Sequence, residues 1–325
     1  MIKQNHGCES GPKVSVIISN YDGMEYLPRC LGNLSNQSYT NYEIIFVDAG
    51  SNDGSAEYVE KEFPNVKVIK CTHIGIGEAI NRGIYHSVGD IIVFDVNTDE
   101  FVEFNWLEEI VQQLKRYNYN IITGTTRIIY GTSLIDEAGV KLNWLGRAKK
   151  LGHLKHKNKF LIDDKPVGFV GTPAFHRAVL DKIGFIDETY YLYAEDLDFC
   201  YRAKLAGYET RCAPRAISHH CIRGTIGKKA GRLEYFLRRA NLRFHLMFMS
   251  SPKLLINLFY NCIFLPIMSF TITIMQLKIS AMHCVKLDGR IKATIWNLNN
   301  IRDTLALRKK YRYQIGHRRS IEPEA

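Results

Sequence analysis

The chain has 325 residues, of which 46% are hydrophobic and 23% charged, and its formal net charge is +10. This length and apolar content can bury a substantial core, which excludes a disordered chain and predicts one large domain with an appendage. The eight cysteines are scattered, without a CxxC pair or a close Cys/His set. This pattern excludes a disulfide-stapled module and predicts reduced, cytosolic thiols.

The chain begins with a polar stretch, MIKQNHGCESGPK, that lacks the apolar region of a secretory signal. We therefore expect a tail over residues 1–11 and a chain whose beginning stays in the cytoplasm.

Strand and helix patterns alternate over about the first 120 residues. The strand patterns are VSVIIS, YEIIFVD, VKVIK and DIIVF, and the helical patterns are MEYLPRCLGNLSNQ, SAEYVEKEF and GEAINRGIYHS. The alternation predicts an α/β fold, with right-handed crossovers and a mostly parallel sheet covered by helices on both faces. Ligands of such sheets bind beyond the carboxyl ends of the strands, where SNYDG, VDAGSNDGS and DVNTDEF fall.

The stretch VDAGSNDGS places Asp48 at the end of the second strand and Asp53 in the turn that follows. Asp48 at this place predicts a carboxylate that accepts hydrogen bonds from a base or a ribose. The alternative is structural, with Asp53 or Ser51 capping the next helix. Neither GxGxxG after the first strand nor a GxxxxGK[ST] loop is present, which argues against a dehydrogenase and a P-loop hydrolase.

The stretch FDVNTDEF carries Asp95, Asn97 and Asp99 after the fourth strand. Mg²⁺ and Mn²⁺ prefer such oxygen ligands and are usually held by one or two carboxylates together with substrate phosphates. The alternative is a strand end before the helix FNWLEEIVQQLKR, with Asp99 and Glu100 as solvated acids.

A second acidic group, Glu195, Asp196 and Asp198, opens an amphipathic helix after the aromatic run YYLYA. These acids either stabilise the helix start or supply a general base in a partly desolvated cleft. Further on, His219 and His220 end a short strand pattern, as structural residues or as ligands.

The order of these stretches, together with GTPAFHR and AEDLDFCYRAKLAGY, closely resembles family 2 of the inverting, nucleotide-sugar-dependent glycosyltransferases, and within it the rhamnosyltransferase-like branch. The resemblance covers roughly residues 12–225. It implies a GT-A fold, a nucleotide-diphosphate sugar donor, a divalent cation (Mg²⁺ or Mn²⁺), and inversion at the anomeric carbon. The acceptor that it implies is a glycan or lipid-linked precursor in polysaccharide biosynthesis.

The resemblance also implies which residues bind the donor and the cation. The positions that match the family's donor site are Ser19, Tyr21, Asp48, Asp53, Asn97 and Thr98. For the cation, counting back from WLEE favours Asp99, and counting forward from GD favours Asp95, because the chain carries one residue more than the common pattern. His220 matches the metal or diphosphate histidine, with His219 as the alternative.

On the catalytic side, the glutamate-aspartate pair of the family matches Glu195 and Asp196, with Asp196 as the general base. Gly171 and Thr172 of GTPAF match the acceptor side. We expect a GT-A domain over residues 12–230. Its nucleotide-sugar-binding half would cover residues 12–124, and its acceptor and catalytic half residues 125–230.

The remaining residues, 231–325, read as a basic, apolar helical tail. The stretch from Leu254 to Leu277 contains no charged residue and is long enough to cross a bilayer. It is interrupted, however, by Asn257, Asn261 and Pro266. We expect amphipathic helices on the anionic inner face of the cell membrane, with a single span or a soluble helix as alternatives.

Three other kinds of protein stay open at this point. They are a nucleotidyltransferase, a nucleic-acid-binding protein suggested by charge alone, and an inactive glycosyltransferase-like subunit. The last is suggested by Ala49, which stands where many relatives have Asp or Asn. We expect no nucleic-acid partner. The basic insertion LNWLGRAKKLGHLKHKNKF, residues 142–160, is expected to shape one side of the cleft.

Overall fold

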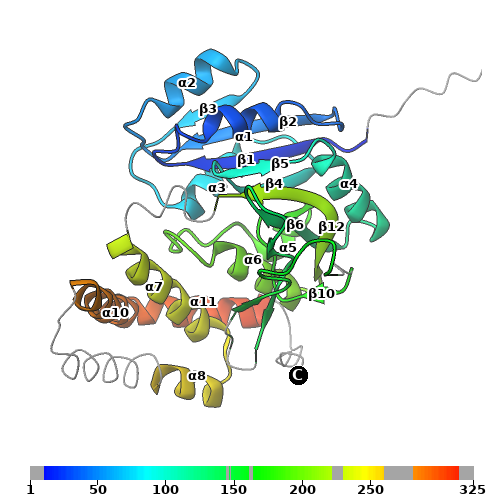
Figure 1. The fold of residues 1–325 in the computed structure, drawn as a ribbon. Coiled ribbons are helices and arrows are strands. Elements are labelled where there is room, and N and C mark those ends of the chain that lie inside the picture. Colours follow the sequence, from blue (N-terminus) through cyan, green and yellow to red (C-terminus); the bar gives the residue numbers. More distant parts are fainter. Residues whose placement is uncertain are drawn as a thin grey trace, which may run out of the picture.

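The structure, a computed structural model, describes residues 11–143, 146, 148–160, 164–221, 230–259 and 281–314. Its centre is a mixed sheet whose main strand order is β10-β12-β6-β11-β4-β1-β2-β3 (Figure 1). The sequence prediction of an α/β fold with a mostly parallel sheet is confirmed.

The strands of the predicted first half pair in parallel, in the order β4-β1-β2-β3. Their bounds are β1 Val14–Asn20, β2 Tyr42–Asp48, β3 Lys67–Lys70 and β4 Ile91–Asn97. β12 (Glu209–His220) and β6 (Ile121–Ile129) form a second parallel pair. Between the two groups lies β11 (Ala174–His176), which is antiparallel to both β4 and β6.

Short antiparallel strands complete the sheet: β5 (Glu100–Val102) pairs with β12, β7 (Ile135–Glu137) with β6, and β10 (Pro166–Val167) with β12. β8 (Val140–Leu142) and β9 (Ala148–Lys150) form a separate hairpin.

The helices of the sheet layer cover both of its faces (Figure 1). Their bounds are α1 Leu27–Leu34, α2 Ser55–Glu62, α3 Ile76–Tyr85, α4 Trp106–Arg116, α5 Val179–Ile183 and α6 Glu195–Leu205. One core cluster packs α3, α5 and α6 against the sheet, and the other packs α1, α2 and α4 against the opposite face. The first predicted helix begins later than expected, at Leu27, because Pro28 fits the first turn of a helix and not its interior.

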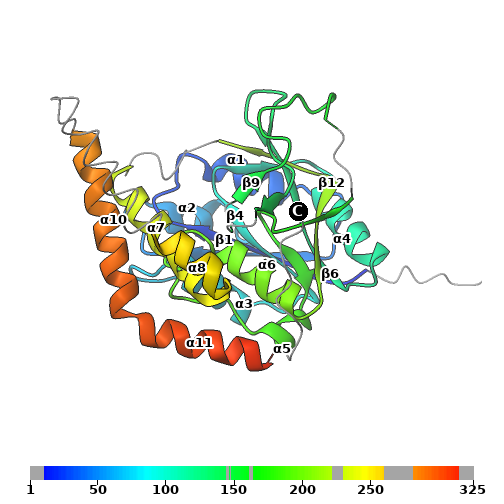
Figure 2. The same ribbon diagram turned by 90° about the horizontal axis from the view of Figure 1, so that it is seen from below.

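The C-terminal helices form a further layer, which lies beside α6 and away from β1–β4 (Figures 1 and 2). Their bounds are α7 Ala230–Phe248, α8 Ser251–Leu258, α10 Ala281–Asn299 and α11 Ile301–Gln314. Buried charges join this layer to the sheet domain. Arg243 of α7 lies 2.8 Å from Asp187 and donates a 2.8 Å hydrogen bond to Thr304 of α11.

Most of the uncharged stretch 254–277 lies outside the described residues, so its predicted membrane helices are not described either. Within the part of the chain that the structure describes, none of the helices is both long enough and apolar enough to cross a membrane.

Candidate active site

The ends of β1 and β2 are joined by a buried polar contact. Asp48, which is 4% exposed, accepts hydrogen bonds from Asn20 Nδ2 at 2.9 Å and from the hydroxyl and amide of Ser51 at 2.6 and 2.9 Å. The carboxylate therefore fixes the turn after β2. Its predicted contact with a base or ribose would have to use the same two oxygens.

Asp53 connects the same turn to the loop after β1. Its Oδ2 accepts a 2.9 Å hydrogen bond from the amide of Met24, and its Oδ1 accepts bonds from the amide and hydroxyl of Ser55. Burial acts to raise the pKa of Asp53, but the hydrogen bonds from Ser55 and Met24 outweigh it, so the pKa lies below its usual value. Asp53 is thus an ionised structural acid at the candidate donor site.

The end of β4 lies beside the same loop. A Cβ on Gly23 would come within 2.6 Å of the Thr98 hydroxyl, so the two segments touch at a place where only glycine fits. Ser19 pairs in register with Asn97 of β4. The polar stretches at the ends of the first, second and fourth strands are therefore brought together, as the strand pattern predicted.

The other predicted donor residues lie on this edge with different exposures. Tyr21 is 43% exposed, whereas Thr98 is 3% exposed. The hydroxyl oxygen of Ser19 is buried and has no hydrogen-bond partner among the residues that the structure describes. A buried hydroxyl without a partner is costly, so the edge offers at least one polar atom to a ligand.

β4 carries a bulge at the predicted metal motif. Val16 and Ile18 of β1 face Val93 and Val96 of β4, so two residues of β4 stand opposite one residue of β1. Asp95 lies in this bulge with φ of 61°, in the left-handed region that is uncommon for residues other than glycine. β4 thus takes up one residue more than β1 over this stretch.

Because of the bulge, the side chain of Asp95 is buried near the acids Glu195 and Asp196 and does not lie at the exposed end of the strand. The side chain is 6% exposed, and burial together with the neighbouring Asp196 raises the pKa of Asp95 well above its usual value. Burial, followed by Asp95 and Asp196, likewise raises the pKa of Glu195. The structure therefore brings the predicted catalytic pair and Asp95 into one cluster, the acid cluster Asp95, Glu195 and Asp196.

Asp196 differs from the other two acids. Burial and the charge of Glu137 raise the pKa of Asp196 to about 6, and its side chain is only partly buried. Glu195 is 5% exposed, and its Oε2 has no hydrogen-bond partner among the described residues. Asp196, with its pKa of about 6, is thus mostly ionised at neutral pH, whereas burial shifts Asp95 and Glu195 toward their protonated forms.

A buried ion pair lies next to the acid cluster. Arg127 of β6 binds Glu100 of β5 through two hydrogen bonds of 3.1 and 3.0 Å. Burial acts to raise the pKa of Glu100, but Arg127 keeps it below its usual value. Glu100 is 1% exposed and Asp99 is 4% exposed, so the alternative in which both are solvated acids is wrong.

The predicted acceptor-side residues support this ion pair. Thr172 is fully buried, accepts a 2.8 Å hydrogen bond from Arg127 and donates one of 3.1 Å to Glu100. The amide of Gly171 donates a 3.0 Å hydrogen bond to Glu137. Thr172 therefore supports the ion pair of Arg127 with Glu100, and Gly171 holds Glu137.

The two histidines at the end of β12 point to different neighbours, as alternation along a strand requires. His219 Nε2 lies 3.1 Å from Glu103 Oε1. His220 instead has its Nδ1 3.0 Å from Asp136 Oδ2 and its Nε2 3.8 Å from Asp99 Oδ1. His220, and not His219, faces the predicted metal acid Asp99.

Several buried charged residues of this site were not singled out from the sequence. They are Glu100, Arg127, Asp136 and Glu137. The exposed Lys150 joins them, because its Nζ lies 2.8 Å from Asp136 Oδ1. Burial acts to raise the pKa of Asp136, but hydrogen bonds from His220 and Lys150 lower it below its usual range. The adjacent acids in SLIDEAGV were the available signal, because acids are rarely placed in a strand pattern without partners.

The residues around Asp99 fit a divalent cation only with help from a substrate. Among the described residues, no group of three or more His, Cys, Asp or Glu side chains could hold a metal ion. A carboxylate and an imidazole whose other nitrogen is fixed by a second acid are nevertheless a common partial ligand set. Asp99 and His220 have this arrangement, and diphosphate oxygens can complete it.

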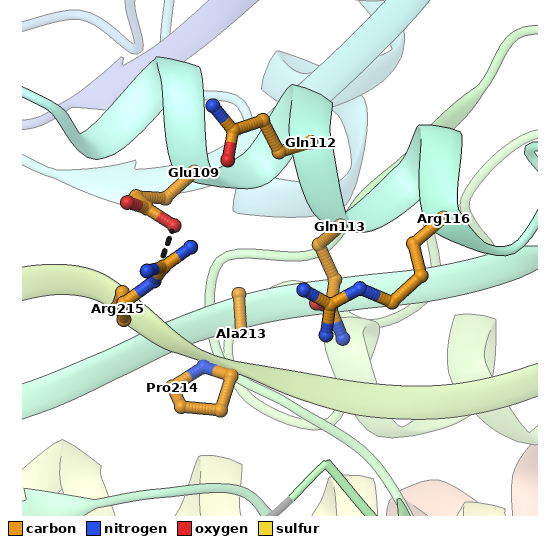
Figure 3. A pocket seen from close by; sticks show the side chains of 7 residues that line it. All are labelled: Glu109, Gln112, Gln113, Arg116, Ala213, Pro214 and Arg215. Atoms are coloured by element: carbon orange, nitrogen blue, oxygen red, sulfur yellow. Dashed lines mark hydrogen bonds and ion pairs between the residues drawn. The ribbon is translucent and has the colours of Figure 1, made fainter.

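A small cavity of about 160 Å³ lies elsewhere, between α4 and β12 (Figure 3). Its lining includes Gln112, Arg116 and the ion pair of Glu109 with Arg215, but none of the predicted site residues.

The sheet, its crossovers and the acids at the strand ends define a GT-A fold of the kind found in glycosyltransferases. The chain belongs to glycosyl transferase family 2, whose sequence profile matches residues 15–184. The prediction of this family from the motifs is confirmed.

Relatives from two bacteria are similar to this chain over part of their length. A putative glycosyltransferase EpsH of Bacillus subtilis is 26% identical over 216 residues, which cover 65% of this chain and 61% of the relative. Glycosyltransferase GlyG of Streptococcus pneumoniae is 30% identical over 115 residues, which cover 34% of this chain and 38% of the relative. The chain thus spans less than two thirds of the length of these relatives.

Solved structures share the fold at low identity. A structure of GalNAc-T7 with UDP, GalNAc and Mn²⁺ matches with a TM-score of 0.60 and 16% identity, covering 91% of this chain and 57% of that one. A structure of S. aureus TarS 1-349 with UDP-GlcNAc matches with a TM-score of 0.50 and 18% identity, covering 71% and 65%. At such identities the likeness concerns the fold alone.

Proposed function

We propose that this chain transfers a sugar from a nucleotide-diphosphate sugar to a hydroxyl group of a glycan or lipid-linked acceptor, with inversion at the anomeric carbon. The observation that carries the proposal is the contrast within the acid cluster. Asp95 and Glu195 are buried, and burial together with neighbouring acids raises the pKa of both well above the usual value, whereas Asp196 is partly exposed with a pKa of about 6. A carboxylate with this pKa is ionised at pH 7 and suited to act as a general base.

In the proposed reaction, Asp196 takes the proton from the acceptor hydroxyl while that oxygen forms a bond to the anomeric carbon. The bond between this carbon and the diphosphate oxygen breaks on the opposite face, so one displacement inverts the configuration. The buried Glu195 and Asp95 flank the base, and burial favours their uncharged forms. The leaving group is a nucleoside diphosphate.

Donor binding is assigned to the edge formed by the ends of β1, β2 and β4. The buried hydroxyl of Ser19 and the exposed ring of Tyr21 are proposed to contact the nucleotide, and Asn97 and Thr98 lie beside them. Asp48 and Asp53 hold the surrounding turns. The solved structures with UDP or a UDP-sugar support a nucleotide-sugar donor. We propose a hexose or deoxyhexose, as in the rhamnosyltransferase-like branch, as the sugar.

Asp99 and His220 are the residues proposed to hold Mg²⁺ or Mn²⁺. When bound, such a cation offsets the charge that grows on the diphosphate leaving group. Asp95 is the weaker candidate, because burial raises its pKa and so disfavours the charged form that binds a cation.

The C-terminal helices are proposed to hold the enzyme on the anionic inner face of the cell membrane. Leu255, Ile256 and Phe259 at the end of α8 are exposed. On α10 a stripe of exposed apolar residues, Ile291, Ile295 and Leu298, recurs at helical spacing. We place the donor half in residues 12–124, the catalytic half in residues 125–230, and the membrane tail in residues 231–325.

Thermal unfolding with a panel of nucleoside diphosphates tests the donor site. UDP, GDP and dTDP are added with and without Mn²⁺, and a ligand of the folded state raises the melting temperature by mass action. We expect a metal-dependent rise for one nucleotide, which Asp99→Ala abolishes. The control Asp181→Ala changes an exposed acid of α5 and should keep the rise. No rise for any nucleotide would instead favour an inactive glycosyltransferase-like subunit.

A further inference from the structure

The basic segment 138–160, which contains the hairpin of β8 and β9, has no role in the proposed reaction. Over these residues the sequence has six lysines and one arginine but no aspartate or glutamate. The six are Lys141, Lys149, Lys150, Lys155, Lys157 and Lys159. All six lysines are exposed. This concentration of one charge is larger than solubility requires, since surfaces usually mix both signs.

Two of these lysines face each other. In the register of the hairpin, Lys141 stands directly opposite Lys149, and Val140 stands opposite Lys150. Like charges directly opposite each other on an antiparallel pair destabilise it. Neither Lys141 nor Lys149 forms an ion pair with any of the residues that the structure describes. The outer face of the hairpin thus carries a repulsion that a bound anion would remove.

The inner face of the same hairpin reaches the candidate active site. Lys150 Nζ lies 2.8 Å from Asp136 and 3.9 Å from Glu137, and Asp136 in turn holds His220, which faces Asp99. Glu137 is also one of the charges that set the pKa of Asp196. Lys149 of the pair is therefore followed in β9 by Lys150, whose side chain contacts the acids around the residues proposed to bind the donor and the acceptor hydroxyl.

We propose that the outer face of this hairpin, with Lys141 and Lys149 at its centre, binds a phosphate group of the acceptor. Ammonium groups hold phosphate as point charges, and two of them side by side can contact the oxygens of one phosphate or of two neighbouring phosphates. Because Lys149 and Lys150 point to opposite faces of β9, the bound phosphate lies away from the reacting hydroxyl. The acceptor is then an elongated molecule with phosphate in its backbone or linkage. This inference rests on the proposed function and names its acceptor class.

Binding of labelled long-chain inorganic polyphosphate, measured by fluorescence anisotropy, tests the proposal. The nucleoside diphosphate that stabilises the protein best is kept in excess with Mn²⁺, so that the donor site is filled. Lys141→Gln with Lys149→Gln should weaken polyphosphate binding by about tenfold, as expected for the loss of two exposed charge contacts. The matched control, Lys61→Gln with Lys67→Gln, removes two exposed lysines at the far edge of the sheet and should change binding less than twofold.

Vesicles of phosphatidylcholine with phosphatidylglycerol provide the second arm. We expect the hairpin variant to sediment with them like the wild type, because the membrane contact is assigned to the C-terminal helices. Loss of vesicle binding with unchanged polyphosphate binding would overturn the proposal and make the hairpin a membrane contact. Equal weakening of polyphosphate binding in both double variants would mean that only the net charge of the protein matters, which would overturn the proposed site. Unchanged binding in the hairpin variant would mean that its lysines are only solvated, which would overturn it too.

The same variants separate this inference from the proposed function. Both double variants should keep the nucleotide-dependent rise in melting temperature, which shows that the fold and the donor site are intact. If no nucleotide stabilises the wild type, the proposed function fails, whereas the comparison of polyphosphate binding between variants still decides the inference.

Discussion

His220 and Asp136 form a contact in which the Nδ1 nitrogen lies 3.0 Å from the Oδ2 oxygen. This contact fixes the imidazole ring, so that its Nε2 points toward Asp99 Oδ1 at 3.8 Å. Asp136 is 1% exposed, and its pKa lies below its usual range, so it stays ionised over the working pH of most enzymes. A histidine oriented by a buried carboxylate is suited to bind a cation or a diphosphate oxygen.

The first prediction separates the two histidines of β12. His220→Gln should weaken the Mn²⁺-dependent binding of the nucleoside diphosphate by about 10 to 100-fold, the usual effect of disturbing a metal ligand or its support. His219→Gln should leave it within twofold, because His219 faces Glu103. Titration of Mn²⁺ at fixed nucleotide, followed by melting temperature, measures both. Equal effects of the two substitutions would contradict the assignment of His220.

The second prediction concerns the general base. Asp196→Asn should lower kcat by about 10² to 10⁴-fold, because the amide cannot accept the hydroxyl proton. Donor binding should persist, since Asp196 lies in the acid cluster and not at the ends of β1 and β2. Steady-state kinetics with nucleotide release as the signal give kcat, and the melting-temperature assay gives donor binding. Turnover near that of the wild type would remove Asp196 from the mechanism.

The third prediction is the pH dependence of the reaction. The base works when ionised, and burial together with Glu137 raises the pKa of Asp196 to about 6. The kcat/KM should therefore be level above this pH and fall about tenfold per pH unit below it. The contact between Lys150 and Glu137 offers a check, because Lys150→Gln removes a positive charge that lies 3.9 Å from Glu137 and should move the midpoint upward. A midpoint near 4, the usual value of an aspartate, would show that the base is a solvated acid.

Much of the architecture could be predicted from the sequence because it depends on local patterns. The strand YEIIFVD occupies the predicted residues, Tyr42–Asp48, and the polar stretches after three strands meet at one edge. Parallel strands with short crossovers leave little freedom in where these ends lie.

The composition of the site was harder to predict, because its charged residues come from distant segments. Glu100 and Arg127 form an ion pair because β5 and β6 both pair with β12. The spacing of these two residues in the sequence does not predict that pair. The position of Asp95 depends on a bulge, which moves one side chain to the other face of the strand. Sequence counting detected the additional residue but could not tell where the chain accommodates it.

The last prediction concerns the buried ion pair between Asp198 and Arg202 of α6. The two side chains are 0% exposed and lie 2.7 Å apart, and Arg202 also donates to the carbonyl oxygen of Ile183 at 2.6 Å. Arg202→Met leaves Asp198 buried without its partner, which should lower the free energy of unfolding by about 3 to 5 kcal/mol. Urea unfolding measures the loss.

The pair of Glu78 and Arg82 on α3 provides a matched control, since it has the same residue spacing but side chains that are 32% and 48% exposed. Arg82→Met should cost less than about 1 kcal/mol. The pH dependence supplies a further check. Burial raises the pKa of Asp198 although Arg202 opposes it, so between the unfolded and the folded pKa the folded state binds this proton more tightly than the unfolded chain does. Without Arg202 this pKa rises further, and stability must fall more steeply as pH increases above the unfolded pKa. A deficit that is the same at pH 5 and pH 8 would mean that lost packing, and not the unpaired charge, explains the effect.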